Sequence, residues 1–93
     1  MNTKELKIKN LVSLYSSDIY KVCLHLSKDK RKAEEILVAV FLQVYLKMDK
    51  LEEDRGWNLS SKNKSDLVLS YLIVCANRIS KEGRYNEETD KKN

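Results

Sequence analysis

The residues whose types and spacing could perform chemistry lie near the C-terminal end of the chain. Arg78, Lys81 and Arg84 follow one another at intervals of three, and Tyr71 precedes Arg78 by seven residues. On a helix, this spacing gives a basic edge with an aromatic side chain near it. Such an edge can contact phosphates while the ring stacks on an unpaired base. It is equally consistent with solvated cations that complement the negative end of a helix dipole.

Trp57, the only tryptophan, also allows two interpretations. It follows Gly56 in a polar stretch, where an exposed ring could stack on a base or contact a partner. The alternative is that the ring tucks under the loop and closes one end of the hydrophobic core.

Residue patterns typical of enzymes are missing from the sequence. There is no GxGxxG motif, no phosphate loop, no His-Glu metal motif and no CxxC pair. Glu34 and Glu35 are adjacent and would point about 100° apart on a helix, so they cannot act as a catalytic pair. His25, the only histidine, has apolar neighbours and is more simply a packing or surface residue than a metal ligand. We therefore expect no enzyme activity, no cofactor and no metal.

Length and composition favour one small helical domain. The chain has 93 residues, of which 42% are hydrophobic and 34% charged, as in folded domains. Two glycines, no proline and long periodic runs predict an all-α fold, a small bundle of three to four helices. We expect one domain over residues 1–84 and a polar, disordered tail over 85–93. The net charge of +4 permits nucleic-acid binding without requiring it.

The cysteines and the N-terminal sequence indicate a cytoplasmic protein. Cys23 and Cys75 each lie inside an apolar helical pattern, which predicts two buried thiols in a reducing compartment. The first ten residues have no apolar segment of the kind found in signal peptides. Since no run approaches the roughly 18 apolar residues of a membrane span, we expect no membrane association.

The first two helices are predicted from apolar periodicity and from a capping residue. The first runs to about Leu26, either as one helix or as two that meet at 16–18, where short polar side chains compete for backbone hydrogen bonds. The second begins after Asp29, whose carboxylate can cap it, and runs to about Lys50.

A polar loop over 51–64 and a third helix follow. Gly56 can supply a positive φ in the loop. Ser65 is expected to cap the third helix, which ends near Gly83. Its predicted core stripe comprises Val68, Tyr71, Leu72, Cys75, Ala76 and Ile79.

The stretch 33–48 organises the chain because it is apolar on more than one side. One stripe at helical spacing is assigned to the core: Ala33, Ile36, Leu37, Val40, Phe41, Val44 and Met48. A second set lies on much of the opposite side: Val38, Leu42, Tyr45 and Leu46. A helix that is apolar most of the way round is either buried on several sides or presents a face to a partner.

Four segments of the chain are informative in the order in which they occur. The first predicted helix contains LYSSDIYKVCLHLS, and the turn SKDKRKAEEI leads into a second helix that ends in FLQVYLKMDKL. An Arg-Gly pair lies in the loop that follows, and the last helix contains YLIVCANRISKEGR. In this order and spacing, residues 11–84 resemble region 2 of bacterial RNA polymerase sigma factors, closest to the extracytoplasmic-function group of the sigma-70 family. The most telling match is Ala33, Glu34, Glu35 and Ile36, followed by Phe41, Leu42 and Tyr45.

The resemblance implies a role in transcription initiation. In that family the second helix binds the clamp helices of the largest subunit of RNA polymerase. The third helix and the preceding loop melt the minus-ten promoter element and bind it as a single strand. By position, the polymerase or partner side would comprise Glu35, Val38, Ala39 and Leu42. The DNA side would comprise Trp57, Tyr71, Arg78, Lys81 and Arg84.

The chain departs from the family pattern on the second helix. The family usually has Gln-Glu-Thr or similar where this chain has Val38, Ala39 and Val40, which exchanges hydrogen-bonding groups for apolar surface. The usual Arg-Asn pair of the third helix is replaced by Asn77 and Arg78. The minus-thirty-five-binding domain of the family does not occur in these 93 residues.

Three interpretations follow from this comparison. The first is a stand-alone, divergent region 2 domain that works with core RNA polymerase, promoter DNA and a separate region-4-like subunit or an anti-sigma factor. The second is a degenerate sigma-like module that forms a homodimer or binds another protein without binding a promoter. The third is a small helical domain whose likeness to sigma factors is coincidental.

Overall fold

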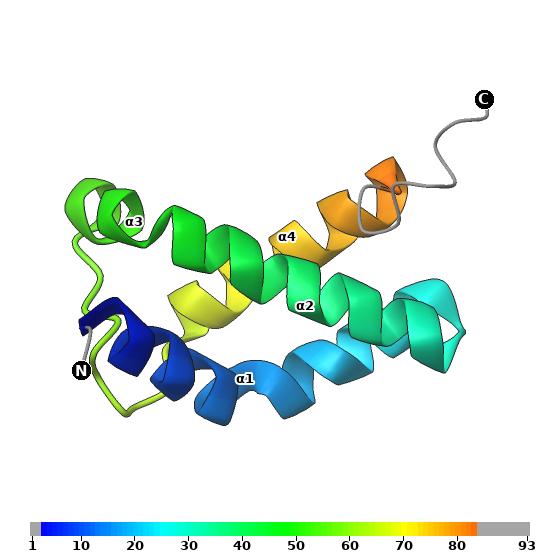
Figure 1. Cartoon of the computed structure of the whole chain (residues 1–93), viewed down its shortest axis with the longest axis horizontal. Helices are drawn as coiled ribbons and strands as arrows, with labels where there is room; N and C mark the ends of the chain where they lie inside the picture. The colour runs from blue at the N-terminus through cyan, green and yellow to red at the C-terminus, as the bar shows by residue number, and fades with distance from the viewer. Residues whose placement is uncertain (1–2, 84–93) are drawn as a thin grey trace.

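Four helices and no strand make up residues 3–83, the part of the chain that the computed structural model describes. They are α1 (Thr3–Ser27), α2 (Lys30–Leu46), α3 (Met48–Arg55) and α4 (Asp66–Glu82). Figure 1 shows α1 and α2 antiparallel and side by side, α3 at one end of this pair, and α4 crossing behind α2. The predicted all-α bundle is therefore confirmed. Arg84 and the predicted tail over 85–93 lie outside the described residues.

The core lies where α1, α2 and α4 meet, because each helix contributes an apolar stripe at intervals of three or four residues. From α1 come Leu11, Tyr15, Ile19 and Cys23; from α2 come Ala33, Ile36, Val40, Phe41 and Val44; from α4 come Val68, Leu72, Cys75, Ala76 and Ile79. Leu37 and Tyr71, which were assigned to these stripes, are only half-buried because they lie at the stripe edges. No helix among the described residues is long and apolar enough to cross a membrane.

Both cysteines are buried in the core and free, as the sequence predicted. Burial raises the pKa of the Cys23 thiol to about 11, because the thiolate would have to form away from water. Cys23 is therefore a neutral packing residue at physiological pH and a poor nucleophile.

The first helix is continuous through residues 16–18, so the alternative of two short helices is wrong. Tyr15 and Ile19 are buried on either side of this polar step and hold the helix against its neighbours. Asp18 does not compete for the helix backbone, because its carboxylate accepts a hydrogen bond from Lys64 Nζ at 2.7 Å. Packing thus outweighs the low helix propensity of the short polar residues.

The turn between α1 and α2 is defined by two residues with distinct backbone geometry. Lys28 has a left-handed φ of 59°, and its N–H donates to the Leu24 carbonyl at 2.7 Å. Asp29 is extended, and its carboxylate accepts hydrogen bonds from the N–H groups of Arg31 and Lys32 at 2.9 and 3.2 Å. The prediction that Asp29 caps α2 is confirmed.

The predicted end of the second helix at Lys50 is wrong. α2 ends at Leu46, Lys47 leaves the helical conformation at φ −105° and ψ 12°, and the separate helix α3 begins at Met48. Beyond this break, Met48 and Leu51 of α3 are both buried in the core. The loop is consequently shorter than predicted, because it occupies residues 56–65 rather than 51–64.

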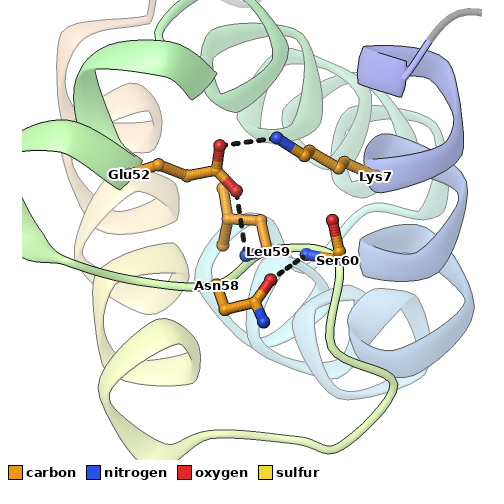
Figure 2. A network of polar contacts seen from close by, with 5 residues as sticks. All are labelled: Lys7, Glu52, Asn58, Leu59 and Ser60. Atoms are coloured by element: carbon orange, nitrogen blue, oxygen red, sulfur yellow. Dashed lines mark hydrogen bonds and ion pairs between the residues drawn. The ribbon is translucent and has the colours of Figure 1, made fainter.

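Contacts with α1 and α3 hold this loop in place. One oxygen of the Glu52 carboxylate accepts from Lys7 Nζ at 2.6 Å, and the other accepts from the Leu59 N–H at 3.1 Å (Figure 2). Within the loop, Asn58 Oδ1 accepts from the Ser60 N–H at 3.0 Å. Leu59 is buried, so the loop contributes a side chain to the core.

The start of α4 differs from the expected side-chain cap. Ser65 occupies the N-cap position in an extended conformation, but its side chain makes no capping hydrogen bond. The Tyr15 hydroxyl instead accepts from the Ser65 N–H at 2.6 Å and donates to the Ser65 carbonyl at 3.4 Å. At the other end, Gly83 has a left-handed φ of 69°, and its N–H donates to the Ile79 carbonyl at 2.9 Å, which confirms the predicted helix end.

Candidate nucleic-acid and partner interfaces

Three side chains from α3, the loop and α4 form an aromatic–arginine cluster, which we define as Arg55, Trp57 and Tyr71. The Trp57 and Tyr71 rings meet edge to face, with centroids 5.6 Å apart and planes at 73°. The Arg55 guanidinium lies 5.1 Å from the Trp57 centroid and 5.2 Å from the Tyr71 centroid. Both contacts are within the range of cation–π attraction.

Helix geometry places Arg55 in this cluster. Arg55 follows Leu51 by four residues and Met48 by seven, so it lies on the same side of α3 as these two buried residues. Gly56 then turns the chain with a left-handed φ of 68°, and Trp57 comes to lie beside the side chain of Arg55. Sequence reasoning noted the Arg-Gly pair but missed Arg55 as a site residue; its spacing from the two buried residues was the available signal.

Trp57 combines features of both roles considered for it. It is half-buried and packs against the core, as a residue closing the loop end would. It also lines a cavity of about 340 Å³ beneath the loop, together with Tyr15, Asn58 and Lys64. Part of its surface is therefore open beside polar and basic groups.

Tyr71 presents a neutral ring at the edge of the core. Burial raises the pKa of its hydroxyl above the ordinary value, and the neighbouring Cys75 thiol acts in the same direction. The positive charges of Arg78 and Arg55 oppose this shift without reversing it. Because the hydroxyl remains protonated, Tyr71 adds no negative charge that would repel a phosphate.

The basic residues of α4 lie farther along the helix, with Arg78 about 20° and Lys81 about 80° around its axis from Tyr71. Arg78 and Lys81 are exposed and, with Val74, line a shallow groove on the outer face of α4. They follow Tyr71 by seven and ten residues, which corresponds to about 10 and 15 Å along the helix axis. The structure thus joins Trp57 to Tyr71 and aligns Arg78 and Lys81 beyond them, whereas Arg84 lies outside the described residues.

A second surface lies on α2. We call it the α2 ridge and define it as Val38, Leu42 and Leu46, which are spaced by four residues and are 66%, 54% and 67% exposed. Of the other residues assigned to the partner side, Glu35 and Ala39 are half-buried and lie toward one side of the ridge. The predicted outer face is therefore dominated by aliphatic side chains.

The ridge borders an apolar groove between α1 and α2 with a volume of about 410 Å³. Its lining comprises Ile8, Val12, Ser16, Leu37, Val38, Phe41, Leu42 and Tyr45. Because Val38 and Leu42 belong to both features, ridge and groove form one continuous apolar surface. Surfaces of this kind mark interaction sites in soluble domains.

Two polar atoms of α2 lack the partners that burial normally requires. Among the described residues, Glu35 Oε1 and Gln43 Oε1 are inaccessible to water and accept no hydrogen bond. A buried acceptor without a donor is unfavourable.

Residues 3–83 contain no candidate metal site, since no group of three or more His, Cys, Asp or Glu side chains there could hold an ion.

Neither a protein-family model, nor a curated protein, nor a solved structure matches the chain.

Proposed function

We propose that this chain is a sigma-like region 2 domain of transcription initiation, a binding protein and not an enzyme. In this proposal α2 binds core RNA polymerase, and the aromatic–arginine cluster with α4 binds the minus-ten promoter element as a single strand. A separate region-4-like subunit would supply recognition of the minus-thirty-five element, and an anti-sigma factor could occupy the same surfaces.

The observation that carries the proposal is the presence of two chemically different surfaces on one small bundle. The α2 ridge is aliphatic, whereas the face formed by the loop and α4 combines two aromatic rings with Arg55, Arg78 and Lys81. Protein interfaces are enriched in apolar side chains at their centres. Single-strand sites combine stacking rings with cations. A domain that couples a polymerase to an unpaired strand needs one surface of each kind.

The nucleic-acid half of the proposal favours single strands over duplex. The aromatic rings lie at the junction of a loop and a helix, where they could stack on bases that are already unpaired. Arg78 and Lys81 are positioned to contact the backbone of the same strand, which fixes its register without reading its sequence.

A titration with the two proposed ligands tests the function. Fluorescently labelled protein is titrated with core RNA polymerase and, separately, with an oligonucleotide carrying a minus-ten element, at low salt because phosphate contacts weaken steeply as salt rises. We expect binding to both ligands and tighter binding to the single strand than to its duplex. Failure to bind either ligand would disprove the proposal.

A second candidate function is favoured by the continuous apolar surface of ridge and groove. A sigma-like module that has lost promoter binding could use this surface for self-association or for another protein partner. Light scattering across a concentration series separates the alternatives. A dimer that dissociates on Leu42→Asp, together with no binding to single-stranded DNA, would support this second candidate.

A further inference from the structure

We infer that Arg55 is a nucleic-acid-contacting residue that exchanges its place against Trp57 and Tyr71 for a phosphate when an unpaired base stacks on the cluster. This inference deepens the proposed single-strand site, on which it rests, by adding a residue and a rearrangement. In the free protein the guanidinium lies 5.1 and 5.2 Å from the two ring centroids and so occupies the surface on which a base would stack.

The position of Arg55 on α3 supports this role. Glu53, the nearest unpaired carboxylate in sequence, lies two residues earlier and points about 160° away from Arg55 on the helix. Asp54 faces Lys50, with Nζ and Oδ2 4.0 Å apart. Glu52 is engaged by Lys7 and by the Leu59 N–H. These three carboxylates are therefore paired with other groups or directed elsewhere, and within residues 3–83 the guanidinium of Arg55 forms no ion pair.

Only weak contacts with the two rings hold the side chain of Arg55 within the described residues. Arg55 is exposed, and its contacts with the rings are cation–π contacts, which at exposed sites are weak compared with binding to a phosphate. A planar guanidinium can both stack on an aromatic face and grip a phosphate with two parallel hydrogen bonds, whereas a lysine ammonium cannot form that fork. The same group can thus protect the rings in the free protein and hold the strand in the complex.

The backbone at the cluster fixes where this exchange occurs. Gly56 adopts a left-handed φ of 68°, a conformation that side-chain-bearing residues adopt only with strain. The contacts of Glu52 with Lys7 and with the Leu59 N–H hold the loop to α1 and α3, so Trp57 stays beside Tyr71. The exchange then requires only a change in the conformation of the Arg55 side chain.

Fluorescence of Trp57, the only tryptophan, tests the inference on the full chain. The probe is oligothymidylate, which contains no promoter element, and its binding is measured at several salt concentrations. We expect the strand to quench Trp57. Arg55→Gln should weaken binding about tenfold and reduce the slope of log K against log salt by about 0.7, the contribution of one phosphate contact to a single strand.

Two further variants test whether the effect depends on the position of Arg55 and on its guanidinium group. Arg31→Gln removes an arginine at the opposite end of the bundle, on the first turn of α2, and should leave the slope unchanged (Figure 1). Arg55→Lys should keep the slope but weaken binding several-fold, because the charge remains while the fork is lost. Circular dichroism verifies that each variant is folded.

The inference is overturned if Arg55→Gln binds with unchanged slope and with an affinity within twofold of the wild type, or if the wild type does not bind oligothymidylate. These outcomes are separable from failure of the proposed function. If oligothymidylate binding depends on Arg55 but core polymerase does not bind, the role in transcription fails and the strand site stands. If polymerase and the minus-ten strand bind without any effect of Arg55→Gln, only the inference fails.

Discussion

The outer faces of α2 and α4 belong to the same bundle but differ in how many elements contribute side chains to each surface. The α2 ridge consists of three aliphatic side chains from a single helix at intervals of four residues. The aromatic–arginine cluster needs three separate elements, namely the end of α3, the loop and α4. A surface made by one helix follows directly from sequence, whereas a surface made by three depends on the tertiary fold.

The two faces should also respond differently to salt. The proposed binding of a partner by the α2 ridge would depend on removal of apolar area from water, which moderate salt hardly weakens. The proposed binding of a strand by the α4 face would depend on phosphate contacts that release counterions, so its affinity should fall as salt rises. Substitutions on each face can therefore be compared through two independent measurements, partner affinity and salt slope.

The largest effect is expected from Leu42→Asp. This change places a carboxylate at the centre of the α2 ridge and should weaken binding of core polymerase, or self-association, by about 2–4 kcal/mol. Leu42 is 54% exposed, so the fold should be retained. Leu67→Asp is the matched control, because Leu67 is 67% exposed on α4 and lies outside the ridge. Equal losses in the two variants would show that the ridge is not the binding surface.

The next largest effect is expected from Trp57→Ala. Removal of the ring should weaken single-strand binding by about 1–3 kcal/mol at every salt concentration, because stacking is lost while the cations remain. Polymerase binding through α2 should be unchanged. Tyr20→Ala, which removes a half-buried ring from α1, serves as a control for loss of aromatic packing alone. A loss in strand affinity that disappears at high salt would contradict a stacking role.

A smaller effect is expected from Arg78→Gln. One lost phosphate contact should lower the salt slope of strand binding by about 0.7 and leave polymerase affinity unaltered. The measurement is the same salt series with oligothymidylate. Lys21→Gln removes an exposed lysine of α1 and should not change the slope. If both variants lower the slope equally, the strand senses overall charge rather than the α4 face.

The smallest effect is expected from the ion pair that joins α1 to the loop before α4. The Lys64 ammonium, which donates to Asp18 at 2.7 Å, holds the pKa of the Asp18 carboxyl below its usual value. A lowered folded-state pKa gives stability that is present above the unfolded-state pKa and is lost as pH falls through the folded-state value. Asp18→Asn should therefore flatten the acid limb of the unfolding profile slightly and leave the neutral-pH melting temperature nearly unchanged.

An Asp49→Asn variant is a suitable comparison in that experiment, because Asp49 is an exposed carboxylate at the start of α3. A flattening of equal size in both variants would mean that the Asp18–Lys64 pair does not contribute specifically to stability at acidic pH.

Most of the fold could be predicted from the sequence because three helices carry long apolar stripes. The Asp29 cap and the Gly83 end were also predictable, since each depends on one residue and its immediate neighbours. The short helix α3 was not, because MDKLEEDR has only two apolar residues and the break at Lys47 involves neither glycine nor proline. Val44, Met48 and Leu51 are buried and keep helical spacing across Lys47, so the apolar pattern does not reveal the break.

The two candidate sites also differ in how far they could be predicted from the sequence. Exposure of Val38 and Leu42 was expected from their positions opposite the core stripe. The contact of Trp57 with Tyr71 joins residues fourteen apart across a loop, and Arg55 meets Tyr71 across the same loop, so both contacts depend on the tertiary fold. The proposed roles in binding polymerase and promoter DNA remain predictions.

The hydroxyl of Tyr15 makes the start of α4 depend on a side chain of α1. It binds both backbone groups of Ser65, fifty residues away, and no side-chain cap is made by Ser65 itself. The first helical hydrogen bond of α4 is local, from the Leu69 N–H to the Ser65 carbonyl, but the bonds of Ser65 with Tyr15 can form only after α1 has docked, whereas Asp29 caps α2 from the adjacent residue. In native-state hydrogen exchange, the Ser65 amide of the wild type should exchange only through global unfolding. In Tyr15→Phe the same amide should exchange through local fraying at the start of α4.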